Sequence, residues 1–338
     1  MKVSVLIVNH NYERYVGQAI DSALGQSHPD VQVVLVDGNS TDGSGSIIRS
    51  YGNRICAVFK ENEGPSSSVN TGFAHCRGDI VLLLDSDDYL HPEAAAKIAA
   101  HWTPETGVLH HRLCKVDEAG REIGFDPPKS LPLDSGNVVP LMLKQRGRYH
   151  LPATSGRVFS RKILEAVLPI PVEKFRMVAD LYLGIATPFL SPVTVLDDTL
   201  AYYRVHGSNY FASNRRTVTR AKMLQQHRWL DLAWELTRDE AIKRNIALPN
   251  PEPLGTSHDL FGRLLLALSG PERISLRTRL KHIWSIVCRA TSDSTGSLAL
   301  RIRQMVLALG VGLSPRWLLA RAYPGLFQDP SKTEQKGR

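Results

Sequence analysis

Short apolar runs that alternate with helix-like segments constrain the fold of the first hundred residues more than any other feature. Such runs occupy residues 3–8, 31–36, 55–59 and 80–84. Runs this apolar suit strands that are buried on both faces of a sheet. The segments between them, such as residues 15–24, place apolar side chains at helical spacing. We therefore predict an α/β fold with a doubly wound, mostly parallel sheet.

Polar residues directly follow three of these apolar runs. They are Asn9 and His10 after the first run, Asp37 after the second, and Asp85, Asp87 and Asp88 after the run at 80–84. Ligands of doubly wound sheets bind beyond the carboxyl ends of the strands, where all of these residues should meet. The plain alternative for the three carboxylates is a solvated turn, because Asp suits turns and helix caps.

The first turn of the predicted sheet excludes the common phosphate-binding loops. A dinucleotide-binding fold needs G-x-G-x-x-G at this point, so that the backbone can approach a pyrophosphate. This chain has Asn9-His10-Asn11-Tyr12, and its first glycine is Gly17. A P-loop is absent as well. If a phosphate group binds, a divalent cation between it and the carboxylates is the usual alternative, and Mg²⁺ or Mn²⁺ suits oxygen ligands.

Charge and cysteine content narrow the partners and the compartment. The chain has 338 residues and a net charge of +8, but residues 207–338 carry 21 Lys+Arg against 10 Asp+Glu. Such asymmetry favours a polyanionic partner, either nucleic acid or an anionic membrane surface. The cysteines have no paired C-x-x-C spacing, which fits a reducing compartment. The N-terminal segment lacks the features of a signal peptide, and we expect it to be the first strand.

Four sequence blocks together resemble glycosyltransferase family 2. They are VSVLIVNHN at 3–11, VVLVDGNSTDGS at 33–44, NTGFAHCRGDIVLLLDSDD at 70–88 and YRVHGSN at 203–209. The resemblance implies an A-type glycosyltransferase fold and inverting transfer of a sugar from a nucleotide diphosphate donor. It covers about residues 1–210, which we predict to be the catalytic domain, with a nucleotide-binding half at 1–100 and an acceptor half at 101–210.

The resemblance assigns roles in donor binding position by position. Asp37 would contact the nucleobase or ribose, next to Val8 and His10 in the loop after the first strand. Asp85 would lie toward the ribose, and Asp87 would bind the metal ion. His206, in YRVHGSN, matches a position near the metal ion or the diphosphate. Each histidine also has a plain alternative as a loop residue without a ligand, and Asp88 has one as a helix cap.

The same resemblance assigns the catalytic base to a carboxylate at the start of a helix after an F-S-R block. Here FSRKIL occupies 159–164 and MVADLYL occupies 177–183, so Asp180 is the predicted base. Inverting displacement needs such a group to remove the proton of the acceptor hydroxyl. The alternative is that Asp180 only caps the helix.

The basic C-terminal part, residues 211–327, is predicted to be a helical extension, and residues 328–338 a disordered tail. Residues 271–290 should form a helix with Leu276, Leu280, Ile283, Trp284 and Val287 on one face. Basic amphipathic helices with tryptophan suit an anionic membrane surface without crossing it. The alternative is that they pack on the catalytic domain. The chain has no nucleic-acid-binding motif, so we expect no nucleic acid partner.

The combined prediction is a metal-dependent inverting hexosyl- or deoxyhexosyltransferase of cell-surface polysaccharide synthesis. A UDP-sugar is the first expectation for the donor and a dTDP-sugar the second, with a glycan or lipid-linked acceptor. The enzyme would be cytoplasmic and peripheral on the inner face of the cell membrane. Two alternatives stay open: a non-catalytic nucleotide- or glycan-binding scaffold of an assembly complex, and a nucleotidyltransferase. The nucleotidyltransferase would normally carry a glycine-rich basic loop after the first strand, which is missing.

Overall fold

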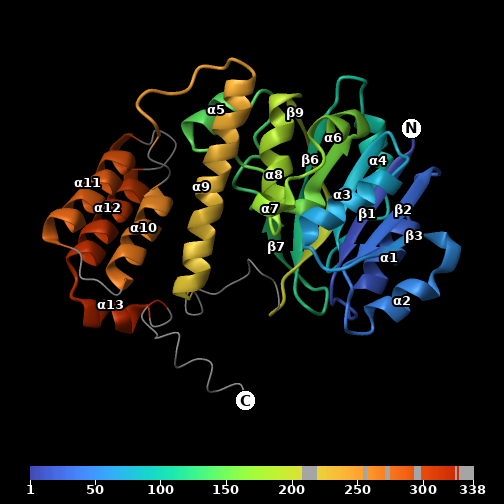
Figure 1. Ribbon diagram of the computed structural model, residues 1–338, viewed down its shortest axis with the longest axis horizontal. Helices are drawn as coiled ribbons and strands as arrows, with labels where there is room; N and C mark the ends of the chain where they lie inside the picture. Colours follow the sequence, from blue (N-terminus) through green and yellow to red (C-terminus); the bar gives the residue numbers. More distant parts are fainter. Residues whose placement is uncertain (208–218, 254–256, 271–274, 293–297, 324–325, 327–338) are drawn as a thin grey trace. The chain divides into compact units, whose positions relative to one another are not determined.

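The computed structural model describes residues 1–207, 219–253, 257–270, 275–292, 298–323 and 326 (Figure 1). The chain divides into two compact units. Unit 1 comprises Met1–Met142, Arg148–Gly207 and Leu236–Ile246, and unit 2 comprises Leu143–Gly147, Ser208–Glu235 and Ala247–Arg338. The division falls inside one long helix, α9. The domain boundaries expected from the sequence stay predictions, as does the tail at 328–338, which lies outside the described residues.

One sheet holds every strand of the described residues. The strands are β1 (Val3–Asn9), β2 (Val31–Asp37), β3 (Cys56–Phe59), β4 (Ile80–Asp85), β5 (Tyr89–Leu90), β6 (Val108–Val116), β7 (Glu122–Asp126), β8 (Arg157–Ser160) and β9 (Val193–Arg204). Their order is β3-β2-β1-β4-β8-β6-β9-β5, and β7 pairs with β6. The pairs among β3, β2, β1 and β4 are parallel, and so is the pair of β6 and β9. The predicted mostly parallel, doubly wound sheet is therefore confirmed.

Both units also contain helices in the part of the chain that the structure describes. The α-helices are α1 (Val16–Leu24), α2 (Ser44–Ser50), α3 (Pro65–His75), α4 (Ala94–His101), α5 (Val139–Lys144), α6 (Arg161–Val167), α7 (Val172–Phe175), α8 (Ala179–Ala186), α9 (Arg220–Lys243), α10 (Ser257–Ser269), α11 (Leu276–Ser292), α12 (Leu298–Leu313) and α13 (Arg316–Ala322). Short 3₁₀-helices lie at η1 (Gly52–Arg54), η2 (Thr154–Gly156) and η3 (Thr187–Phe189).

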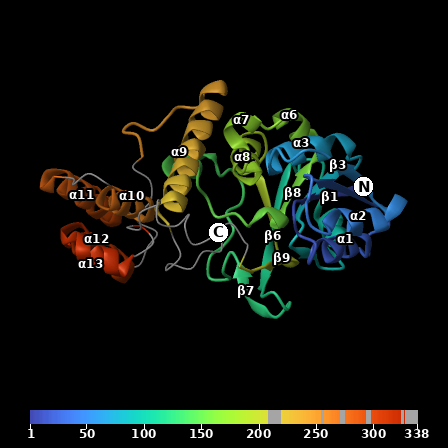
Figure 2. The same cartoon turned by 60° about the horizontal axis from the view of Figure 1, so that its bottom comes forward.

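The two faces of the sheet are covered by different helices because side chains alternate along each strand. On one face, β1, β2 and β4 pack against α1, α2 and α4, as in the contact set of Ile7, Ile20, Leu35, Leu82 and Ile98. The other face of β1 and β2 packs against α3, and Figure 2 shows α3, α6, α7 and α8 together on that side. The result is a parallel core in which β1, β2 and β4 are largely buried and end in polar residues.

Three local features complete the picture of unit 1. The helix α3 begins at Pro65, because proline is favoured in the first turn of a helix. The N-cap of α2 is Gly43, and the Asp42 side chain accepts a hydrogen bond from the Ser44 amide at 3.0 Å. Residues 105–205 contain two long strands, β6 and β9. Both lie inside the sheet, where pairing on two sides supports strands of mixed composition.

In unit 2, α10 to α13 share a small core of their own. It is formed by Leu264, Leu265, Leu268, Ile283, Ile286, Ala308, Val311, Leu319 and Leu326 among others. Of the apolar residues expected on one face of α11, Ile283 is buried and Val287 packs against the core, whereas Leu276, Leu280 and Trp284 are exposed. In the part of the chain that the structure describes, no helix is long and apolar enough to cross a membrane.

Candidate functional site

The sheet topology gathers the predicted site residues at one edge. β1, β2 and β4 run parallel and end at Asn9, Asp37 and Asp85. β8 is antiparallel to β4 and β6 is antiparallel to β8, so β6 and its parallel partner β9 run in the same direction as β4. The end of β9, which leads to His206, therefore lies at the edge where β4 ends. The first residue of the antiparallel β8, Arg157, lies at that edge too.

Asp37 is a buried carboxylate held by its neighbours. Its Oδ1 accepts hydrogen bonds from Asn9 Nδ2 at 2.7 Å and from Ser40 Oγ at 2.6 Å, and its Oδ2 accepts one from the Ser40 amide at 3.0 Å. Asn9 and Asp37 are partners in the register of β1 and β2, which places them side by side. A carboxylate oriented in this way can accept further hydrogen bonds from a ligand that carries N–H or O–H groups.

His10 is fixed in a single orientation beside Asp37. Its Nδ1 lies 2.9 Å from the Gly38 carbonyl oxygen, and its Nε2 lies 3.0 Å from Asn62 Nδ2. The Asn62 Oδ1 accepts from the Gly64 amide at 3.0 Å, which assigns the amide orientation. These contacts make Nδ1 the donor to Gly38 and Nε2 the acceptor from Asn62. Val8 is half-buried between its register partners Val36 and Asp85.

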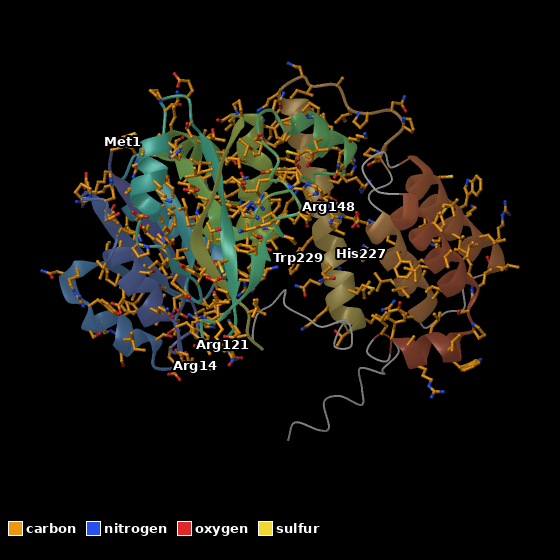
Figure 3. The ribbon with its side chains drawn as sticks, turned by 180° about the vertical axis from the view of Figure 1, so that it is seen from behind. Met1, Arg14, Arg121, Arg148, His227 and Trp229 are labelled. Atoms are coloured by element: carbon orange, nitrogen blue, oxygen red, sulfur yellow. The ribbon has the colours of Figure 1, made fainter. Side chains whose placement is uncertain are left out.

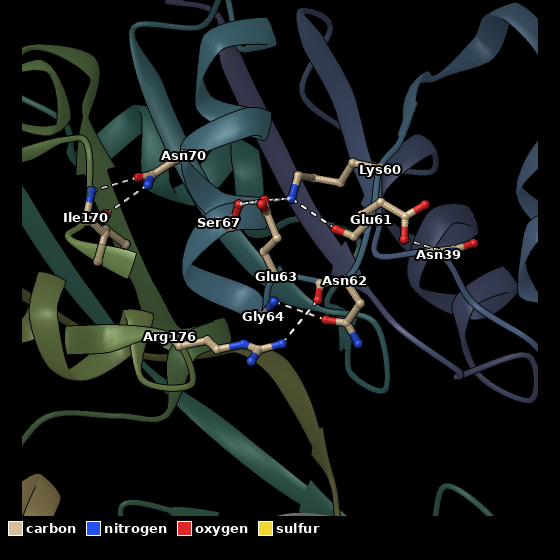
Figure 4. A network of polar contacts seen from close by, with 10 residues as sticks. All are labelled: Asn39, Lys60, Glu61, Asn62, Glu63, Gly64, Ser67, Asn70, Ile170 and Arg176. Atoms are coloured by element: carbon tan, nitrogen blue, oxygen red, sulfur yellow. Dashed lines mark hydrogen bonds and ion pairs between the residues drawn. The ribbon is translucent and has the colours of Figure 1, made fainter. Parts of the chain in front are cut away.

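The loop from Lys60 to Gly64, which includes Asn62, is stabilised by a polar network (Figure 4). Lys60 Nζ donates to Glu63 at 2.5 Å and to Ser67 Oγ at 2.9 Å, and Arg176 Nη2 donates to the Asn62 carbonyl oxygen at 3.2 Å. Asn70 exchanges two hydrogen bonds with the Ile170 backbone, at 2.7 and 3.0 Å. The Asn70 amide group is therefore engaged in joining α3 to the segment before α7, as expected of a structural residue.

Asp88 and Asp85 form the inner part of the acidic cluster. Asp88 accepts hydrogen bonds from Ser155 Oγ at 2.6 Å and from the Arg204 amide at 2.9 Å. Burial raises the pKa of Asp88 well above its ordinary value, and the charges of Asp87 and Asp85 raise it further. Burial also raises the pKa of Asp85 to about 7, with added repulsion from Asp87 and Asp180. The like charges are therefore only partly compensated by their protein neighbours.

Asp87 and His206 form the outer part of this cluster. His206 Nε2 lies 3.0 Å from Asp87 Oδ2, and both residues are buried. The His206 ring packs against Tyr15 and Tyr12, with ring centroids 5.0 and 5.8 Å away. This distance is that of a hydrogen bond between the two side chains. A carboxylate oxygen and an imidazole nitrogen are both metal ligands, so the pair offers two ligands to a divalent cation.

Asp87 and His206 would be the only ligands that the described part of the chain supplies to a metal ion. Among the described residues, no group of three or more His, Cys, Asp or Glu side chains is arranged to hold a metal. Mg²⁺ commonly keeps one or two protein ligands and completes its shell with water and phosphate oxygens. The donor set thus fits a cation that arrives with a phosphorylated ligand better than one held by the protein alone.

Arg204 donates hydrogen bonds to both Asp87 and Asp88. Its Nε donates to the Asp87 carbonyl oxygen at 3.0 Å, and its Nη1 donates to the Glu118 carbonyl oxygen at 3.2 Å. The guanidinium lies over the Tyr15 and Tyr89 rings, at 4.7 and 5.3 Å. This buried cation offsets part of the negative charge of the cluster.

The turn between β6 and β7 lies next to the end of β9. Glu118 pairs with Arg14 at 3.5 Å and accepts a hydrogen bond from the Gly207 amide at 3.4 Å. Arg121 pairs with Asp117 in the same turn at 2.8 Å. Arg14 and Arg121 are labelled in Figure 3, which shows them on the same side of unit 1. The turn therefore contacts both the segment before α1, which holds Arg14, and the segment after β9, which holds His206.

Asp180 lies in the first turn of α8 and reaches the same edge. Its side chain is 32% exposed, and its charge acts on Asp85. Arg157 Nη2 lies 4.0 Å from its Oδ2, and Arg157 Nη1 donates to its carbonyl oxygen at 2.5 Å. The structure thus brings Asp180, Asp85, Asp87 and His206 together from α8, the end of β4 and the end of β9.

Four residues of this region were missed by the sequence predictions: Asn62, Ser155, Arg157 and Arg204. They act through contacts between segments far apart in the chain. Ser155, for example, donates to Asp88, which is 67 positions away. No local pattern signals such a contact.

Comparisons with known proteins agree with this description. Residues 4–168 match the family model described as Glycosyl transferase family 2. An uncharacterized glycosyltransferase of Nostoc sp. is 36% identical over 215 residues, which are 62% of this chain and 66% of the relative. An uncharacterized glycosyltransferase of Rickettsia typhi is 37% identical over 90 residues, 27% of this chain and 28% of the relative. The chain thus spans less than two thirds of either relative's length.

Among solved structures, the fold is similar to that of TarS from S. aureus. TarS residues 1–349, crystallised with UDP-GlcNAc, superpose with a TM-score of 0.52 at 18% identity, covering 96% of this chain and 93% of TarS 1–349. The complex with UDP gives a TM-score of 0.51. The predicted A-type glycosyltransferase fold is confirmed.

Proposed function

Because residues 4–168 form a glycosyltransferase family 2 domain, we propose that the chain transfers a sugar, with inversion, from a nucleotide diphosphate donor to an acceptor hydroxyl group. One observation carries this proposal. Three carboxylates and a histidine from three segments of the chain, Asp85, Asp87, Asp180 and His206, lie at the sheet edge where Asp37 is already oriented. The arrangement offers one group for each requirement of the reaction.

The role of each residue in this proposal follows from the bonds that form and break during the transfer. The acceptor oxygen attacks C1 of the sugar while Asp180 removes the hydroxyl proton. The C1–O bond to the diphosphate breaks, and its electron pair leaves with the nucleoside diphosphate. A divalent cation, Mn²⁺ or Mg²⁺, held by Asp87 and His206 would supply positive charge to the departing diphosphate. Its charge would also favour the ionised forms of Asp85 and Asp88.

In this proposal, the nucleotide lies across the carboxyl ends of β1, β2 and β4. Asp37 accepts an N–H or O–H donor from the nucleobase or ribose, next to His10 and Val8, and Asp85 lies toward the ribose. A uracil or thymine ring offers an N–H to a carboxylate acceptor. UDP-sugar is our first proposal for the donor and dTDP-sugar the second. The complexes of the TarS fold with UDP and UDP-GlcNAc support this order.

The proposal for the acceptor rests on a helix surface that suits contact with a membrane. α11, α12 and α13 contain no Asp or Glu, and their exposed side chains include Trp284 and Trp317, each 68% exposed. Arg277 and Lys281 lie on the exposed side of α11 with Leu276, Leu280 and Trp284. An apolar and basic helix surface suits the headgroup region of an anionic bilayer. We infer that the chain works at the inner face of the cell membrane on a glycan or lipid-linked acceptor of polysaccharide synthesis.

A donor panel tests this function. UDP- and dTDP-hexoses and deoxyhexoses are incubated with the full chain, with and without Mn²⁺, and the released nucleoside diphosphate is measured. The proposal expects metal-dependent release from at least one donor, increased by the acceptor. Metal-dependent UDP binding without turnover of any donor would contradict it and favour a binding scaffold.

A further inference from the structure

Arg157 is a buried cation under the proposed site, and the reaction scheme gives it no role so far. It is the first residue of β8 and is only 6% exposed. Its Nε donates to the Pro152 carbonyl oxygen at 2.8 Å, which anchors the inner part of the guanidinium group. Burial of an arginine is costly unless negative or carbonyl oxygens surround it, so a particular partner should justify its position.

The outer part of the Arg157 guanidinium is directed at Asp180. Nη1 donates to the Asp180 carbonyl oxygen at 2.5 Å, and Nη2 lies 4.0 Å from the Asp180 carboxylate. The Arg157 side chain therefore contacts both the backbone carbonyl group and the carboxylate of Asp180. A planar, five-donor guanidinium can make both contacts at once, whereas a lysine ammonium cannot reproduce this fork.

Gly184 provides the space for this contact. It lies in α8, four positions after Asp180 and therefore on the same helix face. A Cβ atom at Gly184 would lie 3.0 Å from Arg157 Nη1 and 3.0 Å from Leu151 Cδ1. Glycine inside a helix costs about 1 kcal/mol relative to alanine. Since its φ angle is not in the left-handed region, close packing by Arg157 and Leu151 is the feature that explains a glycine here.

We propose that Arg157 is a positioning residue that, in the space left by Gly184, orients the Asp180 carboxylate toward the acceptor hydroxyl group. The inference rests on the proposed function, because it requires Asp180 to be the base. Arg157 itself touches neither donor nor acceptor in this scheme. It fixes the first turn of α8 and supplies a positive charge next to the carboxylate that receives the proton.

The test uses four variants of the full chain: Arg157→Lys, Arg157→Met, Gly184→Ala, and the double variant Arg157→Lys with Gly184→Ala. Gly310→Ala is the matched control, because Gly310 also lies inside a helix, α12, but a Cβ there would meet nothing within 4 Å. Nucleoside diphosphate release at saturating donor gives kcat, calorimetric titration with UDP and Mn²⁺ gives donor affinity, and thermal unfolding gives Tm. The donor is the best substrate of the UDP- and dTDP-sugar panel.

The proposal predicts that Gly184→Ala lowers kcat while UDP affinity stays unchanged and Tm does not fall. A Cβ atom 3.0 Å from its neighbours requires them to move by a few tenths of an ångström. A displacement of about 1 Å at a catalytic group can cost about 100-fold in rate, so a smaller loss, of about 10-fold, is expected. Arg157→Met should lose at least as much kcat, and Arg157→Lys somewhat less. In the Arg157→Lys background, Gly184→Ala should cost little more, because the guanidinium branch that it displaces is gone. Gly310→Ala should keep wild-type kcat.

Several results would overturn the inference. Full kcat in Gly184→Ala, or equal losses of kcat and UDP affinity together with a lower Tm in the Arg157 variants, would assign Arg157 a structural role only. Additive losses in the double variant would also contradict it. Asp180→Asn serves as the reference: if that variant retains turnover, the proposed base is wrong, and this outcome is separate from the behaviour of Arg157.

Discussion

At the scale of single residues, the proposed metal site depends on the pair of Asp87 and His206. Both side chains are buried, and Asp87 Oδ2 lies 3.0 Å from His206 Nε2. Loss of an outer partner of a metal ligand already costs about 10- to 100-fold in affinity or activity. We therefore expect Asp87→Asn and His206→Ala to lower Mn²⁺-dependent turnover at least about 100-fold.

Titration of UDP in the presence and absence of Mn²⁺ separates metal binding from folding. The variants should lose the Mn²⁺-dependent increase in UDP affinity and keep the metal-independent binding at Asp37. Asp198→Asn, which changes a partly exposed carboxylate paired with Lys97, is the matched control and should behave like the wild type. An unchanged Mn²⁺ effect in Asp87→Asn would contradict the assignment.

At the scale of elements, β6 carries two adjacent histidines inside the sheet. His110 and His111 are fully buried, and burial lowers the pKa of His111 from 6.5 to about 4. The unfolded state binds a proton near pH 6.5, before the folded state does, so stability is present above pH 6.5 and is lost as the pH falls toward 4. Over that range His111 should remove about 3 kcal/mol from the free energy of unfolding.

Urea denaturation at several pH values between 7 and 4 measures this loss. His111→Gln should make the free energy of unfolding depend less on pH, because the titrating ring is gone. His101→Gln, at an exposed position in α4, should leave the pH dependence as it is. Equal pH dependence in His111→Gln and the wild type would show that His111 is not the group responsible.

The second prediction at the scale of elements concerns membrane binding by helix α11. Its exposed apolar stripe, Leu276, Leu280 and Trp284, lies beside Arg277 and Lys281. Vesicles of phosphatidylcholine with phosphatidylglycerol should therefore bind the chain and shift its tryptophan emission to shorter wavelength, and vesicles of phosphatidylcholine alone should bind it less. Leu276→Ser with Leu280→Ser and Trp284→Ser should abolish binding.

The matched control is Ile123→Ser, which removes an apolar side chain of 55% exposure from β7 and should bind vesicles like the wild type. Arg277→Gln with Lys281→Gln should weaken binding to the anionic vesicles only. Concentration-dependent self-association through the α11 stripe, with no vesicle binding, would contradict the membrane proposal and indicate a contact between copies of the chain.

The elements also show what could be predicted from the sequence. The strands β1, β2 and β4 and the carboxylates at their ends were found, because buried parallel strands leave continuous apolar runs and because the resemblance covers these blocks. Which apolar residues of α11 are buried and which are exposed could not be found, since Ile283 and Trp284 are adjacent apolar residues in the chain. Their difference depends on packing against α10 and α12. Arg157 was missed for the same reason, because its partners lie in another helix.

At the scale of the whole molecule, every residue of the proposed chemistry belongs to unit 1. Asp37, Asp85, Asp87, Asp180 and His206 come from segments spread over 170 positions of the chain, but all lie within the ranges of that unit. The proposed catalytic activity therefore depends on unit 1, and the proposed membrane contact on unit 2. Losing vesicle binding should then leave the kcat for donor hydrolysis unchanged.

The most direct test of the central claim compares wild type with Asp180→Asn. Nucleoside diphosphate release is measured with the best donor of the panel and saturating Mn²⁺, and UDP affinity is measured in the same buffer. Removing a general base costs about 100- to 10,000-fold in rate. The account predicts a loss of this size in Asp180→Asn with wild-type UDP affinity. Turnover equal to that of the wild type would contradict it.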